Sequence, residues 1–370
     1  MSRNKVMRRL TPQGCVRVPY GVWAMAKLKR DYRAILERNL GFNGNTRWMR
    51  YARQHGFKEV KAWRIRRCPD CGGRPRPQAW GQFVYYSTLI RLLECSQCGL
   101  VWGDAHLDPG VVRKHFDVVY KDDTYFRVSR RRIFRHLARI IDDVAPPGAR
   151  VLDIGGARGD LMAHVVERRP DLYVVVNDIA EISTTSASER FGFATLTGDA
   201  RDLAEHEGRY DVIVMSDVLC YEPDIRLLWS ALDRLLAPGG SLVIRAQNKW
   251  LLIRLWQRWY RATRSRARQR LQDRIPPFNP EHIYIIRSQY LTRRLEGMGL
   301  RQVRVLPSPQ LATPGTRLLT SVFYAFANAV HRLTGGTLAL TPSIVVVGSN
   351  RRARPNVNAR VRAPRVVHHG

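Results

Sequence analysis

The stretch that most constrains the fold of this chain is RVLDIGGARGDLMAHVV, residues 150–166. Its first five residues predict a buried strand, and its last eight predict the start of a helix. Gly155, Gly156 and Gly159 lie between the two elements. Glycine there lets the backbone take positive φ and approach a ligand closely, while the helix amino terminus offers unpaired N–H groups. The stretch therefore predicts a ligand at the first strand-to-helix turn of an α/β sheet.

The residues that follow alternate between strand and helix patterns, as expected for a parallel sheet covered on both faces. A helix over residues 224–240 is expected to end at Pro238-Gly239-Gly240. The remaining expected strands are 171–179, 193–200, 210–219, 241–248 and 343–348. A dinucleotide fingerprint, G-x-G-x-x-G, would need glycine where Ala157 stands, which argues against a nicotinamide enzyme.

The segment VLDIGGARGD resembles motif I, D-x-G-x-G-x-G, of the class I S-adenosylmethionine (SAM) methyltransferases, with Ala157 replacing the middle glycine. Residues 211–244 resemble the fourth and fifth blocks of that family, although Cys220 and Tyr221 replace its E-H pair. The resemblance implies an α/β fold with a Rossmann-like seven-stranded class I methyltransferase sheet and SAM as cofactor. It covers about residues 66–350 and is closest to the type 11/12/23-like methyltransferases that carry an amino-terminal zinc ribbon.

Cofactor-binding residues follow from this resemblance and from strand position. Asp178 ends the second strand, where a carboxylate can accept both hydroxyls of a ribose. Asp199 matches the acidic position whose neighbourhood meets the adenine. The full set expected to bind the cofactor is Asp153, Gly155, Gly156, Gly159, Asp178, Asp199 and Asp217.

Four cysteines have the spacing of a metal site. They form CPDC and CSQC, two C-x2-C pairs separated by 23 residues, and each pair is followed by a glycine that allows the required turn. Four thiolates complete a closed tetrahedral zinc site, which favours a structural metal over a catalytic one. Two disulfides are the alternative, which a reducing cytoplasm disfavours. The predicted zinc ligands are Cys68, Cys71, Cys95 and Cys98.

Catalytic residues are few, because methyl transfer depends mainly on holding donor and acceptor at near-attack distance. An oxygen or carbon acceptor must also lose a proton. By resemblance, His282 is the best-placed general base and Tyr221 the second. A histidine in a loop can instead serve only for capping or packing.

Charge divides the chain into an acidic centre and basic flanks. The sequence has 62 Lys+Arg and 31 Asp+Glu, for a net charge of +31, yet residues 148–250 hold more acidic than basic side chains. Basic flanks suit RNA, DNA, an anionic membrane or a phosphorylated substrate, and the alternative is a solvated, arginine-rich surface. The basic start lacks the apolar run of a signal peptide, so we expect a cytoplasmic protein, soluble or peripheral to the membrane.

The expected organisation has five parts. Two helical inserts, 249–275 and 315–335, are expected to cover the core as a lid or to present the enzyme to a lipid-linked or otherwise anionic acceptor. The parts are a basic extension (1–65), a zinc ribbon (66–104), a linker helix with an aromatic cap (105–147), a SAM-dependent methyltransferase domain (148–350) and a disordered basic tail (351–370).

The expected function is methyl transfer from SAM to a glycan, a sugar nucleotide, a lipid-linked sugar or a secondary metabolite. One alternative is an RNA methyltransferase that uses the ribbon and the basic flanks to bind phosphates. A second is a non-catalytic SAM-binding module, suggested by Ala157 and by the absence of the E-H pair.

Overall fold

A computed structural model describes residues 16–17, 62–76, 81–85, 88–107, 130–203, 206, 208–255, 282–309 and 317–350. Most of the expected extension, the aromatic cap, most of the 249–275 insert and the basic tail lie outside the described residues.

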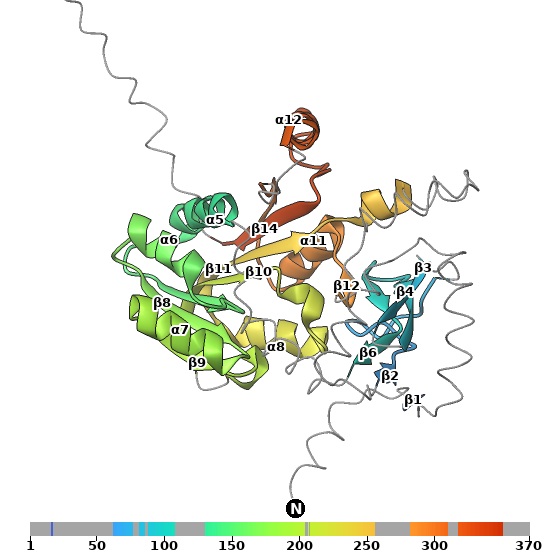
Figure 1. Ribbon diagram of the computed structural model, residues 1–370, viewed down its shortest axis with the longest axis horizontal. Helices are drawn as coiled ribbons and strands as arrows, with labels where there is room; N and C mark the ends of the chain where they lie inside the picture. The colour runs from blue at the N-terminus through green and yellow to red at the C-terminus, as the bar shows by residue number, and fades with distance from the viewer. Residues whose placement is uncertain are drawn as a thin grey trace, which may run out of the picture.

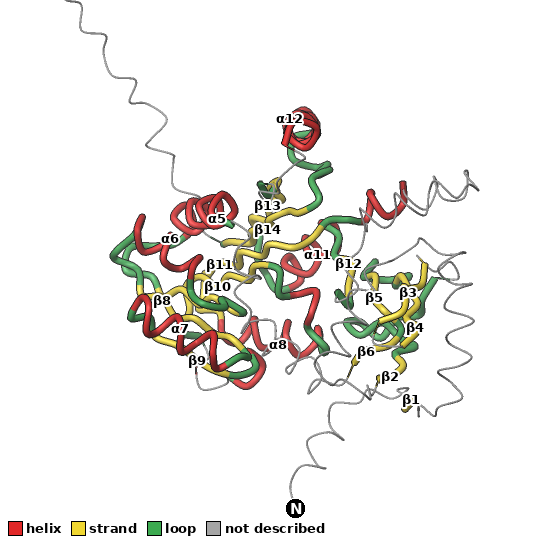
Figure 2. The backbone as a smooth tube through the Cα atoms, viewed as in Figure 1, coloured by secondary structure: helices red, strands yellow, loops and turns green. Residues whose placement is uncertain are grey.

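A seven-stranded mixed sheet forms the centre of the molecule, as Figures 1 and 2 show. Its spatial order is β13 (Gln302–Pro307), β14 (Ser343–Ser349), β11 (Leu236–Gln247), β10 (Tyr210–Ser216), β7 (Arg150–Ile154), β8 (Tyr173–Asp178) and β9 (Ala194–Thr197). Strands β9, β8, β7, β10 and β11 run parallel, whereas β14 is antiparallel to both β11 and β13. The expected Rossmann-like seven-stranded fold is confirmed.

Helices cover both faces of this sheet (Figure 1). Successive residues of a strand point to opposite faces, so Leu152 and Ile154 join one buried cluster and Val151 joins the other. The first cluster includes residues of α8 and α11, and the second includes residues of α5 and α6. The helices are α5 (Arg131–Val144), α6 (Asp160–Arg168), α7 (Glu181–Phe191), α8 (Ile225–Leu235), α11 (Ser288–Gly297) and α12 (Arg317–Leu333).

Helix α8 ends earlier than the sequence predicts. It ends at Leu235, and β11 begins at Leu236, before the Pro-Gly-Gly triplet. Leu236 pairs with Tyr210 of β10, and the register then shifts so that Ser241 pairs with Val212. Pairing with β10 therefore ends the helix, and the triplet lies within the irregular start of the strand.

The cysteine ribbon, residues 62–107, shares a sheet with the carboxyl-terminal half of the chain. The sheet has the order β12 (Tyr284–Ile285), β5 (Val101–Gly103), β4 (Thr88–Glu94) and β3 (Gly81–Tyr85). Strand β12 pairs antiparallel with β5, with Tyr284 opposite Trp102. A smaller sheet joins β1 (Val16–Arg17), β2 (Ala62–Arg64) and β6 (Ala105–Leu107). The ribbon is thus built onto the rest of the fold through β12.

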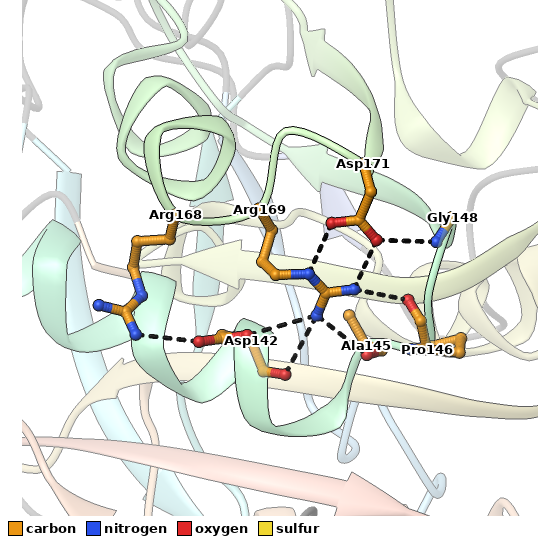
Figure 3. Close-up of polar contacts among 7 residues, drawn as sticks. All are labelled: Asp142, Ala145, Pro146, Gly148, Arg168, Arg169 and Asp171. Atoms are coloured by element: carbon orange, nitrogen blue, oxygen red, sulfur yellow. Dashed lines mark hydrogen bonds and ion pairs between the residues drawn. The ribbon is translucent and has the colours of Figure 1, made fainter. Parts of the chain in front are cut away.

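An arginine fork anchors the start of β7 (Figure 3). The Arg169 guanidinium donates to both carboxylate oxygens of Asp171, at 2.6 and 2.7 Å, and to the Pro146 carbonyl at 3.1 Å. Asp171 also accepts the Gly148 N–H at 2.9 Å, and Arg169 holds the pKa of this carboxyl well below its usual range. The Arg169–Asp171 ion pair thus joins the segment after α5 to the turn before β8. Because Pro146 and Gly148 lie just before β7, these contacts position the start of that strand.

Helix α12 leaves part of its apolar surface exposed. Val322 and Phe326 are 61% and 59% exposed, and Leu333 near its end is 87% exposed, whereas Ala327 is fully buried. In Figure 2, α12 lies beyond β13, the strand at this edge of the sheet. Among the described residues, no helix is both long enough and apolar enough to cross a membrane.

Candidate active site and metal centre

The glycine turn between β7 and α6 has the open backbone that the sequence predicts. Gly155 and Gly159 have φ of 66° and 78°, and Ala157, at the position of the missing glycine, has φ of 49°. A positive φ is unfavourable for any residue with a Cβ, because the Cβ crowds the backbone. Alanine has the smallest side chain with a Cβ. Ala157 therefore keeps the backbone shape that glycine would give.

Two of the glycines allow close approach. A Cβ on Gly156 would lie 2.7 Å from the Asp153 carboxylate, and a Cβ on Gly155 would overlap the Val218 side chain. Val218 lies just before the short helix η4 (Leu219–Tyr221), which follows β10. The glycine turn is therefore packed against the segment that carries Tyr221.

The Asp153 carboxyl group lies beneath this turn. It is 1% exposed, and its Oδ2 is buried with no hydrogen-bond partner. Burial, and then the neighbouring Asp178, raise the pKa of Asp153 well above its usual value. A buried acceptor without a partner is costly unless a ligand or water satisfies it, so Asp153 marks this turn as a binding site.

Asp178 is the last residue of β8, and its carboxylate accepts a hydrogen bond from the backbone of the same turn. Its Oδ2 accepts the Ala157 N–H at 3.0 Å, and its Oδ1 accepts the Ala180 N–H at 2.9 Å. Each carboxylate oxygen has further lone pairs, so Asp178 can accept ligand hydroxyls while it keeps these two bonds. The predicted ribose partner is thus positioned by the backbone of the glycine turn itself.

Asp199 is engaged by a cation. It caps the short helix η2 (Ala200–Asp202) by accepting the Arg201 N–H at 2.9 Å, and the Arg201 guanidinium also binds both of its carboxylate oxygens. Arg201 lies 3.5 Å from Glu222 as well. The predicted adenine-side residue therefore takes part in a cluster of two carboxylates and one guanidinium that follows the carboxyl end of β9.

Asp217 follows β10 and takes the left-handed conformation, with φ of 62°. Its Oδ2 is bound by the Arg245 guanidinium of β11, and its Oδ1 is buried with no partner. Arg245 also donates to the Ser308 hydroxyl at 2.9 Å, and burial lowers the pKa of Arg245 to about 10. Asp217 is thus held at the carboxyl edge of the sheet with one acceptor oxygen unused.

The two predicted base residues contact each other. His282 Nε2 lies 3.1 Å from the Tyr221 hydroxyl and 3.3 Å from Gln247 Nε2. The Ile283 N–H also donates to the Cys220 carbonyl at 2.8 Å, which ties the His282 segment to η4. Burial, and then the charge of Lys249, lower the pKa of His282 well below its usual value. His282 is therefore a neutral imidazole beside a phenol, able to accept a proton.

Sequence reasoning missed Arg245, Gln247 and Lys249, which lie at or just after the end of β11. The sequence pattern that could have indicated these residues is RAQNK, a mostly polar segment at the end of an otherwise apolar strand. In open α/β sheets, ligands bind at the carboxyl ends of the strands, so polar residues there are candidates for a site.

The four cysteines converge. Their sulfur atoms all lie within 4.8 Å of one another, with Cys68 and Cys98 3.5 Å apart and Cys71 and Cys95 3.4 Å apart. A disulfide would need about 2.05 Å. Tetrahedral zinc with Zn–S bonds of about 2.3 Å separates its ligand sulfurs by about 3.8 Å. Burial raises the pKa of Cys71 to about 11, and a divalent cation would reverse that shift. The cluster fits a metal.

Polar contacts fasten this cluster to the main sheet's helices. Tyr290 of α11 donates to Asp70 at 3.0 Å and accepts from Trp229 of α8 at 2.9 Å. Arg226 donates to the Asp70 carbonyl at 2.9 Å, and Arg293 donates to the Cys98 carbonyl at 2.9 Å. Both C-x2-C turns are therefore bound by α8 and α11.

Comparison with known proteins agrees with this geometry. Residues 126–305 match the family described as Methyltransferase domain. The chain carries a SAM-dependent methyltransferase domain. Within it lie the glycine turn, Asp178, Asp217 and the Tyr221–His282 pair. The residues at the turn fit SAM, because Asp153 offers an unpartnered buried oxygen and Gly155 and Gly156 leave no room for a side chain.

Two relatives are highly reducing polyketide synthases. Highly reducing polyketide synthase lcsB of Purpureocillium lilacinum is 29% identical over 147 residues, which cover 35% of this chain and 6% of that protein. Highly reducing polyketide synthase stpks1 of Strobilurus tenacellus is 30% identical over 107 residues, which cover 26% of this chain and 4% of that protein. The methyltransferase thus spans only a small part of the length of these relatives.

Solved structures with partial likeness include a SAM-dependent methyltransferase from Archaeoglobus fulgidus, with 17% identity and a TM-score of 0.40. The match covers 61% of this chain and 97% of that chain. A second is the complex between the Haloferax volcanii Trm112 methyltransferase activator and the putative methyltransferase, with 16% identity and a TM-score of 0.44. That match covers 66% of this chain and 99% of the other.

Replacing Asp178 by alanine is expected to weaken SAM binding by about 1 to 3 kcal/mol, because hydrogen bonds to a charged acceptor are lost. The substitution also releases the Ala157 and Ala180 N–H groups, which favours the upper part of this range. Isothermal titration with SAM measures the effect. The control is Asp233→Ala, which removes an exposed carboxylate of α8 and should leave affinity unchanged. Equal affinity of Asp178→Ala and the unsubstituted chain would refute the ribose role.

Replacing Ala157 by glycine is expected to raise stability by about 0.5 to 1 kcal/mol. The left-handed conformation costs alanine about 1 to 2 kcal/mol, and the greater freedom of glycine in the unfolded chain offsets only part of this relief. Thermal unfolding measures the change, and SAM affinity should persist. A lower melting temperature for Ala157→Gly would show that φ at this position carries no strain.

Proposed function

We propose that this methyltransferase transfers the methyl group of SAM to a small-molecule secondary metabolite. The observation that carries the proposal is the contact between Tyr221 and His282 on a segment packed against the glycine turn. The similarity to two polyketide synthases supports a secondary-metabolite acceptor over a glycan or sugar nucleotide.

SAM supplies an electrophilic methyl group whose bonding electrons stay on sulfur when the S–CH3 bond breaks. Asp178 would bind the ribose, the glycine turn would make room for the methionyl part because Gly155 and Gly156 carry no side chain, and Asp217 would lie at the same carboxyl edge of the sheet with one free acceptor oxygen. Their main contribution is to hold donor and acceptor in line at near-attack distance.

The Tyr221–His282 pair receives the proton that an oxygen or carbon acceptor must lose. The acceptor's O–H or C–H bond breaks, its electron pair forms the new bond to the methyl carbon, and the proton goes to His282 Nε2 through the Tyr221 hydroxyl. Because His282 is held neutral by burial, it accepts this proton without first losing one.

The cysteine cluster would hold one structural zinc ion through Cys68, Cys71, Cys95 and Cys98. Four thiolates leave no open position for substrate, so the metal would stabilise the ribbon rather than take part in chemistry. The contacts of Asp70 and Cys98 with α8 and α11 support a role in holding the active-site helices.

A lipid-linked acceptor is the second candidate. The specific observation in its favour is the exposed apolar surface of α12, which includes Val322, Phe326 and Leu333. An apolar helix surface on a basic protein suits peripheral contact with an anionic membrane. Most of the basic, tryptophan-containing insert lies outside the described residues.

The test is to incubate the purified chain with methyl-labelled SAM and an extract of its own cells, and then to count label in separate fractions. Label in the water-soluble small-molecule fraction is expected. Label confined to lipid would support the lipid-linked candidate instead, and label confined to RNA would refute both. No transfer to any fraction, despite SAM binding, would favour a non-catalytic module.

A further inference from the structure

Gln247 is the last residue of β11, and its side-chain amide lies against the proposed general base. Its Nε2 is 3.3 Å from His282 Nε2, and the Tyr221 hydroxyl is 3.1 Å from the same ring nitrogen. The other polar atom of the amide, Oε1, is buried and has no hydrogen-bond partner within the part of the chain that the structure describes. Gln247 thus has one end engaged with the base and one end unused.

The unused end of Gln247 calls for a donor. Nearly all buried polar atoms in folded proteins have a hydrogen-bond partner, because an amide oxygen taken from water without one is costly. Gln247 stands at the carboxyl edge of the sheet, where open α/β folds bind their ligands. A bound ligand is therefore the natural source of the missing donor.

The role of His282 determines which end of the amide faces outward. In the proposed reaction His282 Nε2 receives a proton, so this nitrogen must carry a lone pair and its neighbours must donate to it. The Gln247 amide nitrogen can donate, whereas its oxygen cannot. With the nitrogen directed at His282, Oε1 is the end left for the ligand, and the ligand must supply an N–H or O–H group.

This amide oxygen differs from the other unpartnered oxygens of the site. Asp153 and Asp217 each have one buried carboxylate oxygen without a partner, and carboxylates suit the ammonium and sulfonium groups of SAM. The Gln247 oxygen belongs to a neutral amide that contacts His282, where the methyl acceptor must lie to lose its proton. Its ligand is therefore the methyl acceptor rather than the cofactor.

We propose that Gln247 Oε1 accepts a hydrogen bond from a hydroxyl or N–H group of the methyl acceptor, next to the atom that is methylated but separate from it. This inference rests on the proposed function and narrows its substrates to molecules that carry such a donor. A site that hydrogen-bonds a substrate donor strongly rejects analogues that lack it, because its own buried acceptor is then left unpaired. Gln247 would thus select the substrate and hold it beside the Tyr221–His282 pair.

The experiment uses the full chain, methyl-labelled SAM and a dilution series of the small-molecule fraction from its own cells. The initial rate against the amount of this fraction gives an apparent KM and a maximal rate. Gln247→Met removes both polar atoms from a side chain of similar length, and Gln247→Glu keeps an oxygen that can accept a hydrogen bond. Gln289→Met is the matched control, because Gln289 is an exposed glutamine of α11. Thermal unfolding and titration with SAM are measured for every variant.

A second measurement does not depend on any variant. The labelled product of the unsubstituted chain is treated with acetic anhydride, which converts O–H and N–H groups to esters and amides. A product that still carries the donor bound by Gln247 changes its retention on a reversed-phase column after this treatment.

The apparent KM is expected to rise at least about tenfold in Gln247→Met, to rise less in Gln247→Glu, and to stay unchanged in Gln289→Met. A role in packing alone would not favour the buried carboxylate of Gln247→Glu over methionine. SAM affinity should change less than about twofold in all variants, and the labelled product should shift after acetylation.

Three results would overturn the Gln247 site and leave the proposed function standing. They are an unchanged apparent KM in Gln247→Met, a loss of SAM affinity as large as the loss of rate, and a labelled product that acetylation does not shift. If Gln247→Met does not fold, Gln247→Glu and the acetylation result decide. Complete absence of label despite SAM binding would overturn the proposed function and this site with it.

Discussion

Replacing Cys68 by serine is expected to release the metal, unfold the cysteine ribbon and reduce methyl transfer at least about a hundredfold. Folding of small zinc modules depends on their metal, with binding free energies of about 10 to 16 kcal/mol. Loss of the ribbon removes β5, the only partner of β12 in the described sheets, and β12 begins two residues after His282. Misplacement of a reacting group by about 1 Å can cost about a hundredfold in rate.

Metal content by elemental analysis, thermal unfolding and initial rate together measure this effect. Cys15→Ser is the matched control, because Cys15 lies outside the two C-x2-C pairs in the sequence, and this variant should retain metal and activity. If Cys68→Ser lost its metal but kept the full rate, the ribbon would be independent of the active site. If it kept one metal per chain, the ligand assignment would be wrong.

Replacing His282 by asparagine is expected to lower turnover by about 10² to 10⁴ while SAM affinity stays the same, since general base catalysis contributes about this much. Asparagine can still hydrogen-bond to Tyr221 but cannot accept a proton. The matched control is His164→Asn, which alters a histidine of α6 that pairs with Glu167 away from the site. An unchanged rate for His282→Asn would remove His282 from the mechanism.

The pH profile gives an independent check on the same residue. The lowered pKa means that His282 stays neutral, and therefore active, as pH falls through its usual value of 6.5. The acid limb of kcat/KM should consequently lie well below pH 6.5 and should disappear in His282→Asn. An acid limb centred near pH 6.5 would point to an exposed histidine as the base.

Much of the sheet could be predicted because its signals are local. The strand at residues 150–154 and the helix after it follow from apolar patterning and from three glycines, and both lie where the sequence places them. The position of Asp178 follows in the same way, because the end of a buried strand fixes which edge of the sheet it occupies.

Other features depend on contacts between distant parts of the chain. Strand β12 has only two residues, too few for any periodicity, and it exists because Tyr284 and Ile285 pair with Trp102 and Val101. The contact of Tyr221 with His282 joins residues 61 apart through the bond from Ile283 to Cys220. Resemblance suggested both residues separately, whereas only the fold brings them together.

The backbone conformation of Ala157 could not be predicted from the sequence. Ala157 reads as a departure from the glycine motif, which suggested a degenerate site, yet its φ of 49° keeps the turn open. The informative quantity is the backbone geometry, which the residue type alone does not encode.

Titration of the purified full chain with SAM tests the central claim most directly, because the proposed methyl transfer presupposes a cofactor at the glycine turn. The predicted result is saturable binding of one SAM per chain with a Kd below about 1 mM, weakened in Asp178→Ala and retained in Ala157→Gly. Absence of saturable binding to a folded, metal-loaded chain would contradict the assignment of the Gly155–Gly159 turn as a SAM site.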